Sequence, residues 1–163
     1  MASTPASKTS LPSVALRRLA TAFLYHSWAA GGLTEGTNAA TVKTANTVTY
    51  FNAGVYKTKA ATDNIAVPAG TAVGASKFCK FLVTLADGTF TITQGNVATT
   101  AALAELPAVP ALGSPVGYFQ IATGGATTYT PGTTDNGAAG VTDTYADITW
   151  PDSGESMFDL TVS

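Results

Sequence analysis

The chain has 163 residues, of which 45% are apolar and only 11% are charged, and its formal net charge is −2 at pH 7. The apolar fraction is enough for a buried core, so disorder along the whole length is not expected. Its charged fraction is well below the roughly 25% of ordinary soluble domains, so hydroxyls, small side chains and backbone must form most of the surface. The single cysteine, Cys79, excludes an internal disulfide framework and a cysteine-based zinc site.

The charges are divided along the sequence. Residues 1–80 hold all eight lysines and arginines with two acids, whereas residues 81–163 hold eight acids and no cation. The cations are dispersed and form no dense basic patch with interleaved aromatics, so binding to nucleic acid is not expected. Two interpretations are open: two solvated faces of one domain, or a head-to-tail contact in which the basic half of one subunit meets the acidic half of another.

Residues 1–40 are predicted to be an N-terminal arm and a helix. Residues 1–9 lack periodicity and are typical of a flexible tail. Over residues 11–28, apolar side chains recur at three- and four-residue steps, Pro12 suits a first helical turn, and two glycines at 31–32 end the pattern. This pattern predicts one amphipathic helix, whose apolar stripe packs either on its own domain or on a partner. The interface candidates are Arg17, Arg18, Leu19, Phe23 and Trp28.

Residues 41–163 are predicted to form a β-rich assembly domain. Residues 47–51 and 55–58 flank Asn-Ala-Gly at 52–54, which predicts a hairpin with a three-residue loop. Residues 77–85 and 89–93 flank an Asp-Gly pair that suits a tight turn, which predicts a second hairpin. Alternation places Cys79 on one strand face with three apolar residues, so we expect it to be a small buried hydrophobe.

The rest of this domain mixes strands with extended segments and loops. Residues 97–106 are Ala-rich and predict about two helical turns, and the prolines in residues 106–112 predict an extended segment lying along a surface. Residues 116–121 predict a central strand, and the Thr/Gly-rich residues 123–140 predict a long loop of the kind that commonly serves an interface. Residues 145–150 and 157–162 are further possible strands, and the last could instead pair with another chain. The predicted fold is mainly β: antiparallel hairpins in a sandwich or barrel-like body with one N-terminal amphipathic helix.

Catalytic side chains are scarce. His26 is the only histidine, and the sequence holds no phosphate-binding loop, nucleophile elbow or HExxH motif. Asp143 with Asp147, and Asp152 with Glu155, could offer oxygen ligands to calcium, but the spacing of a calcium loop is missing. No run approaches the 18 or more apolar residues of a membrane span. We therefore expect no enzyme, no cofactor, no metal site and no membrane partner.

Four segments resemble small virion structural proteins of tailed bacteriophages, and within that group the head decoration or cement proteins. They are TYFNAGVYKTKA at 49–60, FCKFLVTL at 78–85 with its Asp-Gly turn, PVGYFQI at 115–121 and YTPGTTD at 129–135. The resemblance spans about residues 45–145 and lies in segment order and style. It implies a β-rich body without catalytic residues that assembles, often as trimers, on the outer capsid surface of the virion and ties neighbouring capsomers together. The partners implied are the major capsid protein and further copies of this chain.

Two other classes of protein are alternatives. One is a head fibre, tail or baseplate adaptor protein, in which the C-terminal portion would contact a receptor. The other is a secreted β-sandwich adhesin or carbohydrate-binding module, for which Trp150, Tyr145 and Tyr129 would have to form the aromatic platform.

Overall fold

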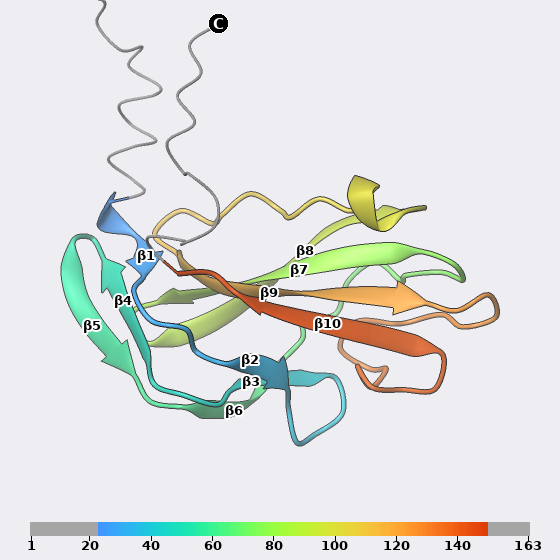
Figure 1. Cartoon of the computed structure of the whole chain (residues 1–163), viewed down its shortest axis with the longest axis horizontal. Coiled ribbons are helices and arrows are strands. Elements are labelled where there is room, and N and C mark those ends of the chain that lie inside the picture. The colour runs from blue at the N-terminus through green and yellow to red at the C-terminus, as the bar shows by residue number, and fades with distance from the viewer. Residues whose placement is uncertain (1–22, 150–163) are drawn as a thin grey trace, which may run out of the picture.

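The computed structural model describes residues 23–149 (Figure 1), and these residues form ten β-strands and one short 3-10 turn. In chain order the elements are β1 His26–Ser27, β2 Leu33–Glu35, β3 Thr41–Thr44, β4 Val48–Asn52, β5 Val55–Lys59, β6 Thr62–Ala66, β7 Phe78–Ala86, β8 Thr89–Ala98, η1 Ala101–Leu103, β9 Ser114–Thr123 and β10 Val141–Asp147.

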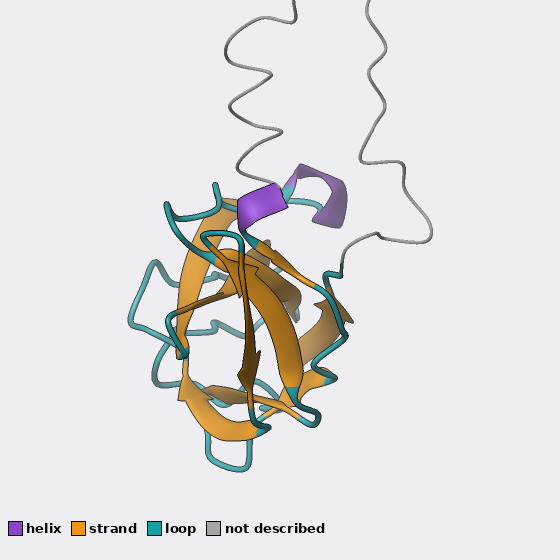
Figure 2. Cartoon of the chain, turned by 90° about the vertical axis from the view of Figure 1, so that its left-hand side faces the viewer, coloured by secondary structure: helices purple, strands orange, loops and turns teal. Residues whose placement is uncertain are grey.

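The strands form two layers, so the arrangement is sandwich-like (Figures 1 and 2). One layer is a four-stranded sheet in the order β10-β9-β7-β8, and two three-stranded sheets, β1-β4-β5 and β2-β3-β6, form the other. Short bends join β3 to β4 and β5 to β6, so the second layer is in effect one long bent hairpin with β1 and β2 along one side. Every strand pair is antiparallel. The prediction of a mainly β body built from antiparallel hairpins is confirmed.

The core lies between the layers in two clusters. The larger cluster packs Leu33, Val42 and Ile65 of the second layer against β7 and β9, where Phe81 and Phe119 stack with ring centroids 4.7 Å apart. The smaller cluster packs Val48 and Tyr50 of β4 against Leu85 and Val116. Partly buried Phe90 touches both clusters and so links them.

The predicted burial of Cys79 is confirmed, because successive side chains of β7 alternate between the two faces. Cys79, Phe81, Val83 and Leu85 are all fully buried on the inner face. Burial raises the pKa of the Cys79 thiol, which is accordingly a packing group and not a reactive thiolate.

Both predicted hairpins are present, and the first has a tighter turn than expected. Asn52 pairs with Val55, so the loop is the two-residue Ala53-Gly54, with φ of +52° and +76°. The Asp87-Gly88 turn has φ of +46° and +77° and joins β7 to β8. Positive φ at both central residues matches the right-handed twist of the flanking strands.

The prediction that the N-terminal helix extends to Trp28 is wrong. Residues 11–22 lie outside the described part of the chain, and helical geometry is seen only at Phe23 and Leu24. The chain then enters β1, where His26 pairs with Phe51 and Ser27 with Tyr50. Backbone pairing with β4 thus overrides the local helical periodicity. β1 and β2 precede the boundary predicted after residue 40 and belong to the same sheets as later strands.

Residues 97–106 also differ from the prediction. β8 continues to Ala98, since Val97 and Ala98 pair with Cys79 and Phe78, and the only helical turn that follows in this stretch is η1. The connection from β8 to β9, residues 99–113, crosses β7 to reach β9 on its other side, and we call it the strap. Residues 116–121 lie in β9, which is central as predicted, and residues 124–140 form the predicted long loop. The last strand within residues 23–149 is β10, which begins and ends earlier than the strand predicted at 145–150. Residues 157–162 lie outside the described residues.

Candidate functional site: an exposed apolar side

Large apolar side chains that remain exposed gather in two places. In the described residues they are Phe23, Leu24, Trp28, Val55 and Tyr56, which we call the aromatic end, and Leu103, Leu106, Val109 and Leu112 of the strap. The helical turn at residues 23–24 and the strap run along the same side of the sandwich (Figures 1 and 2). Single exposed apolar residues are ordinary, but a gathering of them marks an interaction surface.

Trp28 and Tyr56 of the aromatic end belong to a row of rings on the β1-β4-β5 sheet that also includes His26 and Phe51, and we call it the aromatic row. His26, Phe51 and Tyr56 are neighbours in register, so their side chains share the outer face of the β1-β4-β5 sheet. The His26 ring stacks on Phe51 with a centroid distance of 4.7 Å, and Tyr56 meets Phe51 edge-on at 5.7 Å. Trp28 lies on the same face, with its ring centroid 6.4 Å from that of His26. Trp28 and Tyr56, at the two sides of the row, are 55% and 58% exposed.

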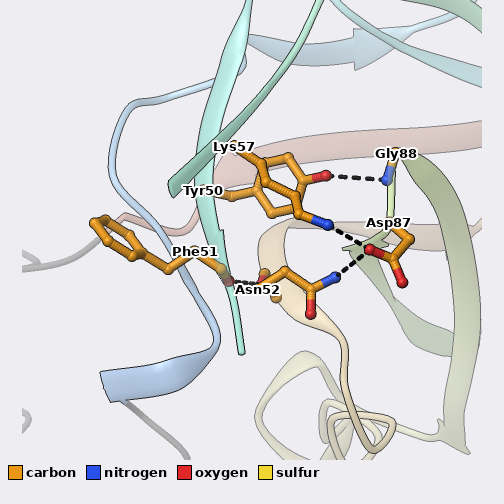
Figure 3. A network of polar contacts seen from close by, with 7 residues as sticks. Tyr50, Phe51, Asn52, Lys57, Asp87 and Gly88 are labelled. Carbon is orange, nitrogen blue, oxygen red and sulfur yellow. Dashed lines mark hydrogen bonds and ion pairs between the residues drawn. The ribbon is translucent and has the colours of Figure 1, made fainter. Parts of the chain in front are cut away.

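The opposite face of the same strands rests on the β7–β8 turn (Figure 3). The Tyr50 hydroxyl accepts the N–H of Gly88 at 2.9 Å, and the amide of Asn52 donates to Asp87 at 3.3 Å. Lys57 forms an ion pair with Asp87, and its hydrogen bond to that carboxylate raises the pKa of Lys57. Figure 3 shows the Phe51 ring on the other side of the strand from this network. The outer aromatic row therefore has a fixed support.

Backbone contacts hold residues 23–28 against the sheets. The N–H of Gly54 donates to the carbonyl of Leu24 at 3.0 Å, and the N–H of Trp28 donates to the carbonyl of Thr49 at 2.8 Å. The hydroxyl of Ser27 donates to the carbonyl of Pro115 in the other layer at 2.6 Å. This segment, which carries His26 and Trp28 of the row, is thus connected to both layers.

The strap is held to the large sheet through Asn96. The side chain of Asn96 donates to the carbonyl of Leu103 at 2.9 Å and accepts the N–H of Glu105 at 2.7 Å. A Cβ at Gly95 would lie 2.2 Å from the carbonyl oxygen of Glu105, so only glycine permits this approach. Ala104 is buried, while the four larger apolar side chains of the strap remain exposed.

The predicted interface residues fall on both sides of the described boundary. Arg17, Arg18 and Leu19 lie outside the described residues. Phe23 and Trp28 belong to the aromatic end, where 49% and 55% of their surfaces are exposed, so the β body buries each of them only in part. Packing of these two side chains on a partner stays a prediction. Val55 and Tyr56 were not predicted. Their only sequence signal is that two large apolar residues directly follow a tight turn.

The two halves of opposite charge are mixed within one subunit. Lys57 meets Asp87, and the carboxylate of Asp147 accepts the N–H groups of Gly32 and Leu33, both at 3.1 Å. Asp147 thus holds the start of β2, which is a structural use for one of the acids considered for calcium. Charges from the two halves therefore meet inside one subunit. A head-to-tail charge contact between subunits stays a prediction.

The long loop is anchored by Asn136, which is fully buried. Its amide donates to the carbonyl of Thr41 at 2.9 Å and accepts the hydroxyl of Tyr129 at 2.7 Å. Burial raises the pKa of the Tyr129 hydroxyl. Burial is also the larger cause that raises the pKa of the Tyr145 hydroxyl, and a hydrogen bond with Asp143 is the second. Tyr129 has no exposed surface, so it cannot contribute to the sugar platform of Trp150, Tyr145 and Tyr129 that the carbohydrate-binding alternative would need. Trp150 lies outside the described residues.

A group of acids lies beside this loop. The carboxylate of Glu35 accepts the N–H of Gly137 at 2.7 Å. Burial, contact with Asp135 and the nearby charge of Asp143 raise the pKa of Glu35, although the Gly137 bond opposes the shift. Within residues 23–149, no three His, Cys, Asp or Glu side chains are grouped so that they could hold a metal ion.

Two further findings concern the chain as a whole. None of the helical segments in the described residues is long and apolar enough to cross a membrane. Comparison with protein families, with curated proteins and with solved structures gives no match.

Proposed function

We propose that this chain is a structural virion protein that decorates the outer surface of a bacteriophage capsid and stabilises the shell through homo-oligomeric contacts. Its partners are the major capsid protein and further copies of itself, with a trimer favoured by the sequence resemblance. It acts without a cofactor and without catalysis. A protein that binds only the assembled shell stabilises it by mass action, in proportion to the logarithm of the free protein concentration over the dissociation constant.

The observation that carries the proposal is the exposed apolar side. A tryptophan side chain presents up to about 250 Å² of surface. With 55% of Trp28 exposed, docking could bury roughly 140 Å² there, worth about 3 kcal/mol at about 25 cal/mol per Å². The β-rich body and the resemblance in segment order both favour a decoration protein. The aromatic row, which rests on the β7–β8 turn, offers such a protein an attachment surface.

The number of copies in a purified virion tests the proposal. Quantitative mass spectrometry of virions of the phage that encodes the chain should find hundreds of copies per particle. A dozen copies or fewer would favour the alternative of a head fibre, tail or baseplate adaptor. Absence from the particle would contradict both virion assignments.

The exposed rings of Trp28 and Tyr56 favour a second candidate, a carbohydrate-binding module. Sugar rings stack on exposed aromatic side chains, and these two are the most exposed rings in the described residues. A glycan array that captures the protein, with loss of capture in the Trp28→Ala variant, would support this candidate. A secreted carbohydrate-binding module would also be absent from purified virions, and this absence distinguishes the second candidate from the decoration proposal.

A further inference from the structure

The outer edge of β8 differs from the other sheet edges of the described residues. Edge strands present unpaired N–H and C=O groups, and proteins commonly protect them with charges or by keeping them short. β10 carries Asp143 and Asp147, β5 carries Lys57 and Lys59, and β6 carries Asp63. β1 and β2 have two and three residues. β8 has ten residues and no charge among them.

Only the first half of β8 is open. At Gln94 the edge is covered, because the Gln94 side chain accepts the N–H of Thr71 at 2.8 Å and donates to its carbonyl at 2.7 Å. Beyond it, Asn96 binds the strap. No side chain among residues 23–149 covers residues 89–93 in this way, and the side chains of Thr89 and Thr91 are exposed.

The two-residue turn decides which backbone groups face this open edge. In a hairpin closed by two residues, the pair flanking the turn, here Ala86 and Thr89, exchanges hydrogen bonds, and bonded and non-bonded pairs then alternate. Thr91 therefore bonds to β7. Phe90 and Ile92 fall in non-bonded pairs, so their N–H and C=O groups point away from β7. No hydrogen bond from another described residue reaches these groups.

We propose that residues 89–93 pair antiparallel with the same residues of a second copy of this chain. In the register centred on Thr91, Phe90 faces the partner's Ile92 and Ile92 faces the partner's Phe90. These two pairs exchange four backbone hydrogen bonds, so every open N–H and C=O of the two residues is used. Thr91 then lies opposite the partner's Thr91, and Thr89 opposite the partner's Thr93.

The side chains fit this pairing as well as the backbone does. Cross-strand threonine pairs and aromatic–β-branched pairs are both favourable, and like charges opposite each other are unfavourable. No charge lies between Thr89 and Ala98, so the symmetric pairing brings no like charges together. The two four-stranded sheets would join into one continuous sheet across a two-fold axis. This contact uses one edge only and is compatible with a three-fold contact elsewhere on the subunit.

Disulfide trapping tests the register directly. The Thr91 pair is non-bonded across the interface, with Cα atoms about 4.5 Å apart, which is within the range for a disulfide. The two Thr89 residues of the dimer are offset by four residues along the strands, so their Cα atoms lie about 13 Å apart, which is too far for a disulfide. Thr91→Cys should therefore form a covalent dimer under mild oxidation at least tenfold faster than its matched control Thr89→Cys. The native Cys79 is buried and gives a low background.

Equal cross-linking of the two variants, or none for Thr91→Cys at millimolar protein, would overturn the proposal. A second measurement uses sedimentation velocity over a range of concentrations. Thr91→Lys places two lysines opposite each other across the axis and should weaken association at least tenfold, whereas Thr144→Lys on the β10 edge should not. Association that is indifferent to Thr91→Lys would also overturn the proposal. Salt separates this contact from a head-to-tail charge contact, because only the latter weakens as salt screens it.

Discussion

Replacing Asn136 by Ala should destabilise the fold measurably, because this side chain ties the long loop to β3 and, within the loop, to Tyr129. It is fully buried and serves the carbonyl of Thr41 and the hydroxyl of Tyr129. The carbonyl of Thr41 also accepts the N–H of Gly36 at 3.0 Å and so keeps a partner. The buried hydroxyl of Tyr129 loses its partner, which costs about 1–3 kcal/mol. A domain of this size is stabilised by about 5–15 kcal/mol in total. At about 2–4 °C per kcal/mol, the melting temperature should fall by roughly 2–12 °C.

Thermal and urea unfolding followed by circular dichroism measure this loss, with the exposed Asn38→Ala as the matched control. A double-mutant cycle sharpens the reasoning. In the Asn136→Ala background, Tyr129→Phe removes the stranded hydroxyl and should recover part of the lost stability. A loss below about 1 kcal/mol for Asn136→Ala, or simple additivity of the two substitutions, would refute the role assigned to these hydrogen bonds.

Three further outcomes follow from the geometry. Glu35→Gln should raise the melting temperature at neutral pH and lose this advantage below about pH 4.5. The pKa of Glu35 is raised on folding, so the protonated carboxyl is the form that the folded state favours. The stability that Glu35 contributes is therefore complete below the unfolded pKa and is lost as pH rises through the folded pKa. The exposed Glu105→Gln is the control for that pH series, and a constant difference between Glu35→Gln and the native chain from pH 4 to 8 would contradict it. Gly95→Ala should displace the strap and cost about 1–3 kcal/mol, since its Cβ would lie 2.2 Å from the carbonyl oxygen of Glu105, whereas Gly74→Ala, which has open space, should cost little; calorimetry compares the two. Phe81→Ala should cost about 3–5 kcal/mol in urea unfolding, because its ring is fully buried against Phe119, and a loss below 1 kcal/mol would contradict that packing.

Local turn chemistry and alternation were enough to predict the centre of the fold. Asp87 and Gly88 both tolerate the positive φ that a two-residue hairpin turn requires. Two-residue alternation placed Cys79 and Phe81 on one buried face before any partner strand was known. These features depend on neighbours along the chain, so the sequence displays them directly.

The failures occurred where a distant strand decides the local structure. His26 and Ser27 continue a helical pattern in sequence but pair with β4, and Val97 and Ala98 lie in an Ala-rich stretch but pair with β7. A hydrogen-bonded ladder outweighs a helix propensity that differs by only a few tenths of a kcal/mol per residue.

The candidate site was only partly predictable for the same reason. Trp28 was identified from a helical stripe that does not extend to it. Its neighbours on the outer face depend on the register of β1, β4 and β5, which brings Tyr56 into the same row. Whether Tyr56 faces a core or solvent is set by what covers the sheet, and alternation alone cannot distinguish the two.

Binding of the purified protein to phage heads that lack it tests the central claim most directly. The Trp28→Ala/Tyr56→Ala double variant should bind at least tenfold more weakly than the native chain while its melting temperature stays within a few degrees, because both side chains are more than half exposed. The Thr142→Ala/Thr144→Ala double variant, altered at exposed positions of β10, should bind as the native chain does. Equal binding by all three proteins would contradict the claim that the aromatic end is the attachment surface.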